Sequence, residues 1–157
     1  MIRETNYPSI GWTAARLART VELALGTAEL STAQYRLLNQ LAQGDDASTS
    51  LAKKLAVSAP SVTAVVDGLV HRGAIERTPS VEDRRRISLA LTSTGKQLLA
   101  EAEAAVSSRL ESVAGELEDQ ERIQAALSAL ALWGEALDKA RARRFALRES
   151  AVEVGRS

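Results

Sequence analysis

The stretch HRGAIERTPSVEDRRRISLAL, residues 71–91, decides the fold. Within it Ile87, Leu89 and Leu91 alternate with small or polar residues, so the hydrophobic period is two. Such alternation is typical of a β-strand with one buried face, and residues 74–78 can pair with it. Residues 79–85 then form the tip of a two-stranded hairpin. The tip and the adjoining Arg86 hold three of the five arginines between residues 72 and 86, which predicts a wing that meets anions.

Two helices joined by a tight turn are predicted before the hairpin. Ser48 can cap a short helix over residues 51–56, and a turn at 57–58 leads into a helix over residues 59–72. The side of this second helix that faces the core is apolar and consists of Val62, Val65, Val66 and Leu69. Gly73 can close this helix because a residue without Cβ adopts left-handed backbone. The order predicts a winged helix-turn-helix.

Further helices flank this core. One is expected over residues 10–25, and the capping box at Ser31 and Gln34 opens another. After the hairpin, Thr92 can cap a long helix, and a last helix begins near Gln120. We therefore expect a single mostly α domain with a small β-hairpin wing, an α+β fold. Its expected parts are a winged helix-turn-helix lobe at 31–92, dimerisation helices at 1–30 and 93–146, and a frayed tail at 147–157.

Composition excludes several classes of function. The chain has no cysteine, which removes disulfides, thiol nucleophiles and zinc–cysteine sites. His71 is the one histidine of the chain. A catalytic triad would have to use it as its base, and a zinc site within one chain would have too few histidine and cysteine ligands. We expect no enzyme, no cofactor and no metal. No stretch approaches the ~18 apolar residues of a membrane span, so we expect a cytoplasmic protein without membrane contact.

The outer face of the predicted helix over residues 59–72 is small and polar. A helix in the DNA major groove reads base edges from such a face. Ser58, Ser61, Thr63 and Asp67 lie on it, and Asp67 can accept a hydrogen bond from a cytosine amine. An ordinary solvated helix face explains the same pattern taken alone. The wing that follows favours double-stranded DNA as the partner.

The wing supplies the positive charge for such an interface. Residues two apart share a face of a strand, so Asp83 can hold the guanidinium of Arg85 for a narrow minor groove. The predicted phosphate contacts are Lys53, Arg72, Arg77, Arg84 and Arg86. Taken alone, these charged residues are more simply interpreted as a surface turn whose mixed charge keeps the protein soluble.

The first and last helices carry apolar stripes too large for a lobe of this size to cover. Pairing of two copies across a two-fold axis would bury them, so we expect a homodimer. Two recognition helices related by that axis meet half-sites about one helical turn apart. The expected operator is therefore near-palindromic.

Four motifs resemble the multiple-antibiotic-resistance regulator (MarR) family of winged helix-turn-helix repressors over about residues 31–95. They are Leu51-Ala-Lys-Lys-Leu-Ala56, Ser58-Ala-Pro-Ser-Val-Thr63, Leu69-Val-His-Arg-Gly73, and Asp83-Arg-Arg85 followed by Leu91-Thr92 and Gly95. The resemblance implies a transcriptional regulator, in the usual case a repressor. Two features depart from the family pattern: Ala64 stands where a long polar residue is common, and Gly68 weakens the recognition helix.

The resemblance also implies an effector. Similar proteins release DNA when a small anionic ligand, often aromatic or phenolic, binds between the dimerisation and DNA-binding regions. Trp12, Arg16 and Tyr35 are the candidate pocket residues, an aromatic wall with one cation. Core packing and a surface arginine explain the same three residues equally well.

The preferred function is a ligand-responsive, homodimeric DNA-binding regulator. One alternative is a constitutive architectural protein that binds many DNA sequences with similar affinity. A second is a winged-helix module whose arginines meet acidic protein partners instead of phosphates. An enzyme is the remotest alternative, because the chain offers few nucleophiles and bases.

Overall fold

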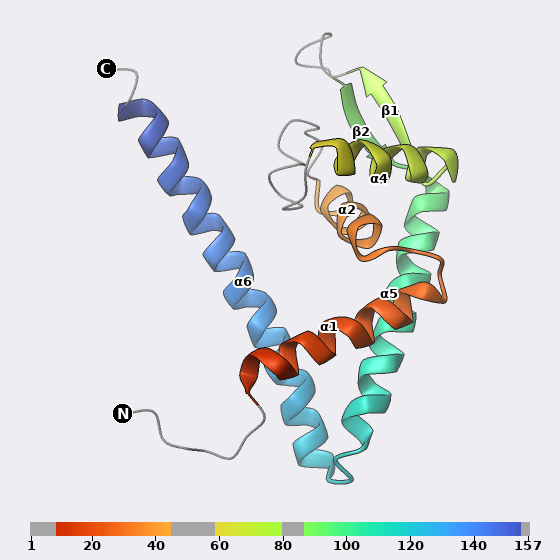
Figure 1. Ribbon diagram of the computed structural model, residues 1–157, viewed down its shortest axis with the longest axis vertical. Helices are drawn as coiled ribbons and strands as arrows, with labels where there is room; N and C mark the ends of the chain where they lie inside the picture. Colours follow the sequence, from red (N-terminus) through yellow and green to blue (C-terminus); the bar gives the residue numbers. More distant parts are fainter. Residues whose placement is uncertain (1–8, 45–58, 80–86, 155–157) are drawn as a thin grey trace. The chain divides into compact units, whose positions relative to one another are not determined.

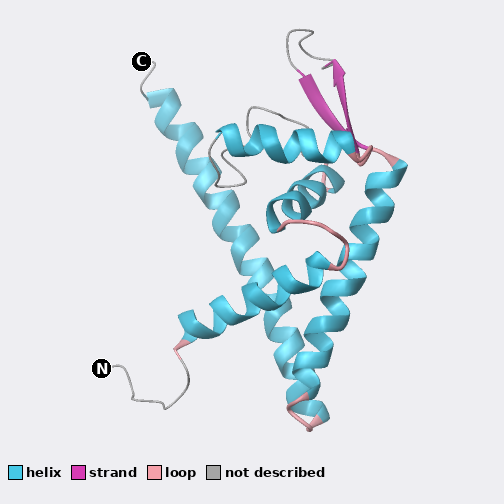
Figure 2. Cartoon of the chain, turned by 45° about the vertical axis from the view of Figure 1, so that its right-hand side comes forward, coloured by secondary structure: helices cyan, strands magenta, loops and turns pink. Residues whose placement is uncertain are grey.

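The computed structural model describes residues 9–44, 59–79 and 87–154. Helices make up nearly all of these residues, and the described strands form one antiparallel hairpin (Figure 2). This is the mostly α architecture with a small hairpin that the sequence predicts. The chain forms two compact units, Met1–Arg109 and Leu110–Ser157. The division falls within one long helix, α5 (Ser93–Gly115).

The first two helices begin at serine caps. In α1 (Ile10–Gly26), the Ser9 hydroxyl accepts a hydrogen bond from the Trp12 amide at 3.2 Å. In α2 (Thr32–Ala42), the Gln34 amide donates to the Ser31 hydroxyl at 3.2 Å, and the Ser31 amide donates to Gln34 Oε1 at 2.9 Å. Both partners of the predicted capping box are therefore confirmed.

The predicted recognition helix is α4 (Ala59–His71). Gly73 follows it with φ of +66°, and its amide donates to the Val70 carbonyl at 2.9 Å. The Ala74 amide donates to the Leu69 carbonyl, also at 2.9 Å. This pair of bonds is a Schellman motif, which needs left-handed backbone at the glycine. The predicted helix end is confirmed.

Strands β1 (Ile75–Pro79) and β2 (Ile87–Leu91) form the hairpin. Ile75 pairs with Leu91, Arg77 with Leu89, and Pro79 with Ile87. Directly paired residues in an antiparallel sheet share one face, so Arg77 lies on the same face as the buried Ile75 and Leu89. Pro79, which we expected in the tip, is the last residue of β1.

Thr92 joins the hairpin to α5. Its hydroxyl lies 2.6 Å from the Gly73 carbonyl oxygen and accepts from the Gly95 amide at 3.0 Å. Its amide donates to the Ala74 carbonyl at 3.1 Å. The threonine thus caps α5, as predicted, and also ties the start of α5 to the turn between α4 and β1.

The core of the first unit lies where α1, α2, α4 and the hairpin meet. In sequence order α1 packs on α2, α2 packs on α4 and β2, and α4 packs on β1 (Figure 1). Its fully buried large side chains are Leu25, Leu37, Leu38, Leu69 and Ile75. Burying leucine and isoleucine side chains here stabilises the unit by roughly 1.5–3 kcal/mol for each residue. The recognition helix and the hairpin are thereby fixed to one hydrophobic core.

The second unit contains the end of α5 and α6 (Gln120–Val154). Asp119 starts α6, because its Oδ1 accepts from the Glu121 amide at 2.9 Å. The helix runs on through residues 147–154, where we expected a frayed tail. Alanine, leucine, arginine and glutamate are good helix formers, and neither glycine nor proline occurs before Gly155 in this stretch.

Candidate nucleic-acid interface

The recognition helix α4 separates its residues nearly as the sequence predicts. Val62, Val66 and Leu69 are buried, and Val65, the fourth residue predicted to face the core, is half-buried. Thr63, Ala64 and Asp67 are exposed. Ser61 lies within α4, but its side chain is not among those described. The described outer face is therefore small and polar, with one carboxylate. Such a face offers little steric obstacle to a base edge.

Most of the predicted DNA contacts lie outside the described residues. These are Lys53 and Ser58 before α4, and Asp83, Arg84, Arg85 and Arg86 between the strands. Their roles stay predictions. Of the predicted DNA contacts, the structure describes Thr63, Asp67, Arg72 and Arg77 with their side chains.

Asp67 and Arg77 meet in an ion pair between α4 and β1. The two residues are ten apart in sequence, and the guanidinium Nη2 donates to Asp67 Oδ1. Their side chains remain 56% and 41% exposed, respectively. The sequence predicts a cytosine contact for Asp67 and a phosphate contact for Arg77, and both stay predictions. In the structure the two side chains bind each other on the surface beside the recognition helix.

Arg72 is also bound within the protein. Its Nη1 donates to the Glu29 carbonyl at 2.7 Å, and its Nη2 lies 3.3 Å from the Ala28 carbonyl oxygen. Both carbonyls belong to the turn between α1 and α2. Arg72 therefore ties the end of the recognition helix to that turn, while its predicted phosphate contact stays a prediction.

Close packing against α2 explains the glycine at position 68, which the sequence alone does not. A Cβ placed there would lie 3.2 Å from Gln34 Nε2. The amide of the α2 capping box thus approaches the α4 backbone closely, in agreement with the packing of α2 on α4. The glycine that departs from the family pattern serves this helix contact.

Comparison with known proteins identifies the family. The model of the MarR family matches residues 30–87, the segment that begins just before α2 and ends at the start of β2. The structure of the transcriptional repressor CouR, bound to a 23-mer DNA duplex, is 30% identical to this chain with a TM-score of 0.62. That match covers 80% of this chain and 89% of CouR. The chain belongs to the MarR family.

Two other relatives agree. The reduced form of MarR from Escherichia coli is 20% identical, with a TM-score of 0.66 over 80% of this chain and 96% of that one, and shares the fold. The repressor YetL of Bacillus subtilis (strain 168) is 31% identical over 96 residues, 59% of this chain. The chain spans 58% of the length of YetL. MarR-family proteins are non-enzymatic DNA-binding regulators, in agreement with the expectation that the chain is not an enzyme.

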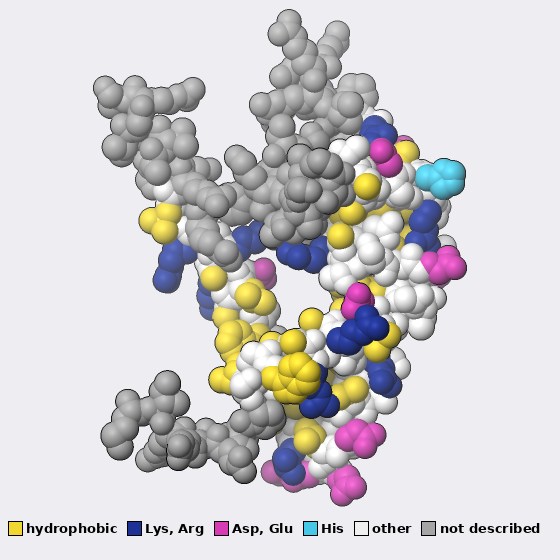
Figure 3. All heavy atoms as spheres, in the orientation of Figure 1, with side chains coloured by type: hydrophobic (Ala, Val, Ile, Leu, Met, Phe, Trp, Pro, Cys, Tyr) yellow, Lys and Arg dark blue, Asp and Glu magenta, His cyan; other side chains and the backbone are white. Residues whose placement is uncertain are grey.

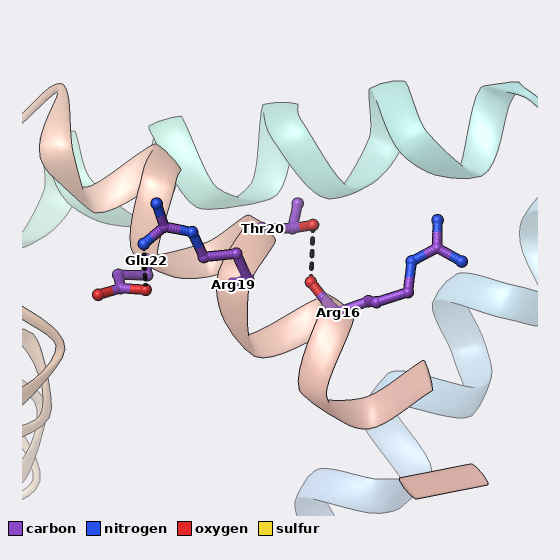
Figure 4. A network of polar contacts seen from close by, with 4 residues as sticks. All are labelled: Arg16, Arg19, Thr20 and Glu22. Atoms are coloured by element: carbon purple, nitrogen blue, oxygen red, sulfur yellow. Dashed lines mark hydrogen bonds and ion pairs between the residues drawn. The ribbon is translucent and has the colours of Figure 1, made fainter. Parts of the chain in front are cut away.

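The candidate effector residues of this MarR-family protein begin with Trp12 and Arg16, one turn apart on α1. Trp12 is 62% exposed. The Arg16 side chain extends away from the neighbouring Arg19–Glu22 ion pair, whose atoms are 2.7 Å apart (Figure 4). Among the described residues, no hydrogen bond or ion pair involves the Arg16 guanidinium.

Tyr35, the third candidate, is partly buried and already bound. Its hydroxyl donates to Glu103 Oε1 on α5 at 2.7 Å. Burial and the neighbouring Glu103 carboxylate raise the pKa of Tyr35 to about 12. The phenol therefore stays protonated, and the nearby carboxylate disfavours an anion at this point. Sequence analysis gave no signal for Glu103, because the partner is 68 residues away.

Two negative findings concern the described part of the chain. It contains no group of three histidine, aspartate or glutamate side chains that could hold a metal ion. None of its helices is both long enough and apolar enough to cross a bilayer.

Proposed function

We propose that the chain is a sequence-specific DNA-binding transcriptional regulator that acts as a homodimer on a near-palindromic operator. The observation that carries the proposal is the small, polar, exposed face of α4 held beside the β1–β2 hairpin. The most telling comparison is CouR, a repressor of the same family whose structure contains a DNA duplex. The function is non-catalytic.

The packing of the first unit suits this role. A helix can enter the major groove only if its other side is anchored, and α4 buries Val62, Val66 and Leu69 against the core. Its described exposed residues include no large hydrophobic side chain. On this proposal Ser58, Ser61 and Thr63 face the groove, and Lys53 with Arg84, Arg85 and Arg86 supplies cations to phosphates and the minor groove.

Exposed hydrophobic side chains on α1 and α6 support the homodimer (Figure 3). On α1 they are Ile10, Trp12 and Leu23, and on α6 they are Leu130, Leu132, Trp133, Leu137 and Leu147. Large apolar side chains gathered on helices are characteristic of a surface that another chain covers. A second copy of this chain fits the proposal best, because a palindromic site needs two recognition helices.

Repression and its relief by a small molecule are the finer parts of the proposal. YetL and CouR are both named repressors, which favours repression here. An effector must bind the dimer conformation that cannot bind DNA more tightly than the one that can, because equal affinity for both would leave their populations unchanged. Trp12 and the Arg16 guanidinium are the accessible candidates for an aromatic anionic ligand. Tyr35 can contribute to the same ligand site only while its hydroxyl is bonded to the Glu103 carboxylate.

The test is selection of DNA from a random duplex library, followed by fluorescence anisotropy at several salt concentrations. Enrichment of a near-palindromic sequence that binds at least about a thousandfold more tightly than a shuffled duplex supports the proposal. Equal, salt-sensitive binding of both duplexes would establish an architectural protein instead. No binding of either would favour a protein-contact module.

Two further measurements test its parts. Sedimentation equilibrium is expected to give twice the 16.8 kDa mass of one chain, and a monomer at the concentrations that bind DNA contradicts the dimer. Arg85→Ala is expected to weaken binding to the specific duplex. Lys53→Ala is expected to lower affinity for all sequences and to reduce the salt slope, the slope of log affinity against log salt concentration, by about one. Unchanged binding in both variants would refute these site assignments.

A further inference from the structure

We propose that Asp67 and Arg77 form a clasp that sets the angle between the recognition helix and the hairpin, so that Asp67 acts as a positioning residue and reads no base. The inference rests on the proposed DNA-binding function and specifies how that site is built. Its basis is the ion pair between α4 and β1.

The clasp lies away from the turn that joins its two elements. Asp67 lies four residues before His71, the last residue of α4, or about 6 Å from the helix end at 1.5 Å for each residue. Arg77 follows Ala74 by three residues, or about 10 Å along the strand at 3.3 Å for each residue. The helix, the strand and the ion pair therefore close a triangle whose third corner is the Gly73–Ala74 turn. A closed triangle resists changes in the angle at that corner.

The turn itself is fixed by other contacts. The Schellman bonds of Gly73 and Ala74 end the helix there, and Thr92 binds the same two residues. These contacts hold the corner, and the core packing of α4 on β1 holds the buried side. The clasp adds a link on the exposed side, between α4 and the middle of β1, so that the small face of α4 and the hairpin keep one angle toward DNA.

The position of Arg77 in the hairpin explains the contact. Arg77 is on the face of the sheet that also carries Ile75 and Leu89, the face packed toward the core and α4. Its aliphatic stem leaves this face and its guanidinium reaches the exposed Asp67 carboxylate. An arginine on the opposite face, such as one at the position of Glu76 or Thr78, would start from the wrong side of the sheet.

Charge also favours pairing over separate DNA contacts. An unpaired carboxylate beside phosphates is repelled, and it stays near DNA only when a cation neutralises it or when a cytosine amine binds it. Arg77 neutralises Asp67 in this structure. The pair therefore contributes no net charge to the interface, and removing Arg77 should leave the number of phosphate contacts unchanged.

The test is a double-mutant cycle on DNA binding with Asp67→Asn, Arg77→Gln, the double variant and the charge swap Asp67→Arg/Arg77→Asp. Each protein is titrated against the duplex enriched from the random library and against its shuffled control, at several salt concentrations. Circular dichroism and thermal unfolding establish that each variant folds. Because the pair is exposed, folding should survive its loss.

The clasp predicts the same result for both single variants. Each should lower the preference for the enriched duplex by about three- to fivefold, the upper part of the roughly 1.4- to fivefold range that coupling of exposed ion pairs implies. The double variant should be no worse than either single one, and the charge swap should regain most of the preference. The slope of affinity against salt should stay that of the wild type.

Three outcomes overturn the inference while leaving the proposed function intact. An altered base preference in Asp67→Asn alone means that Asp67 reads a base. An equal loss on both duplexes in Arg77→Gln, with a salt slope lower by about one, means that Arg77 binds a phosphate. Additive losses without rescue by the charge swap mean independent roles. A wild-type protein without any preference between the duplexes contradicts the proposed function itself.

The Arg19–Glu22 pair provides the matched control. It is an exposed ion pair in the same unit, on α1, with side chains 63% and 55% exposed. Arg19→Gln and Glu22→Gln should each leave the preference and the salt slope unchanged. A loss as large as that of the clasp variants would show that any exposed pair has this effect, and would overturn a positioning role specific to Asp67.

Discussion

Replacing Gly95 with alanine should disrupt the junction between the hairpin and α5. Gly95 is buried in the first turn of α5, and an added Cβ would lie 1.9 Å from the Ala74 carbonyl oxygen. Ordinary van der Waals contact begins at 3.4 Å, so the helix and the turn must separate by about 1.5 Å. The obstacle is backbone, which cannot move aside by changing a rotamer.

The hydrogen bonds at this junction set the magnitude. Thr92 binds Gly73, Ala74 and Gly95 through three bonds between 2.6 and 3.1 Å long. A separation of that size breaks bonds that each contribute roughly 1 kcal/mol. We therefore expect Gly95→Ala to lower the free energy of unfolding by about 3 kcal/mol. This is a large share of the roughly 5–15 kcal/mol available to a typical domain.

Urea denaturation followed by circular dichroism, at one protein concentration for all variants, measures the change. Gly26→Ala is the control, because Gly26 ends α1 without positive φ and a methyl group added there would meet nothing within 4 Å. It should change stability by less than about 1 kcal/mol. If Gly95→Ala does not accumulate, Thr92→Val and Thr92→Ser test the same junction, since only serine keeps the hydroxyl. A loss below about 1 kcal/mol in both Gly95→Ala and Thr92→Val would refute the reasoning.

Three other predictions concern single contacts. Arg72→Ala should lower the free energy of unfolding by roughly 1–2 kcal/mol in urea denaturation, because the Arg72 guanidinium binds the turn between α1 and α2. The dependence of DNA affinity on salt should not change. A salt slope lower by about one would instead assign Arg72 to a phosphate. Ser31→Ala should cost about 1 kcal/mol through the lost capping box, whereas Ser31→Asp should retain most of it. In a Tyr7→Phe background, ultraviolet titration should place the pKa of Tyr35 near 12, and Glu103→Gln should lower that pKa. Because the pKa is higher in the folded state than in the unfolded state, the protonated Tyr35 contributes its full stability below pH 10. This contribution is lost as the pH rises through about 12.

Local structure could be predicted from the sequence because its causes are local. The capping box at Ser31, the cap at Thr92 and the helix end at Gly73 each depend on residues within a turn of one another. The alternation around Leu89 likewise depends only on the pleat of one strand. Together with the two helices expected over residues 51–56 and 59–72, these features predict a winged helix-turn-helix, and comparison with MarR-family structures confirms that fold.

Contacts over long sequence distances could not be predicted. Arg72 binds carbonyl oxygens 43 and 44 residues earlier, and Tyr35 binds a carboxylate 68 residues later. A backbone carbonyl carries no sequence signal, so nothing in the residue types shows that Arg72 has a partner. The continuation of α6 through residues 147–154 differs from the predicted frayed tail for another reason: the basic run at residues 139–144 is typical of a helix end, but the residues after it also favour helix.

The role of Asp67 shows how these two kinds of information combine. Periodicity correctly placed it on the exposed face of α4, and an exposed carboxylate on a recognition helix has cytosine as its natural partner in DNA. The fold brings a cation from β1 to the same carboxylate before any DNA arrives. The guanidinium already engages Oδ1 and neutralises the carboxylate, so a cytosine amine meets a shared acceptor there instead of a free anion. On the clasp proposal the carboxylate contributes to specificity by holding the hairpin beside α4, and the double-mutant cycle distinguishes this role from base reading.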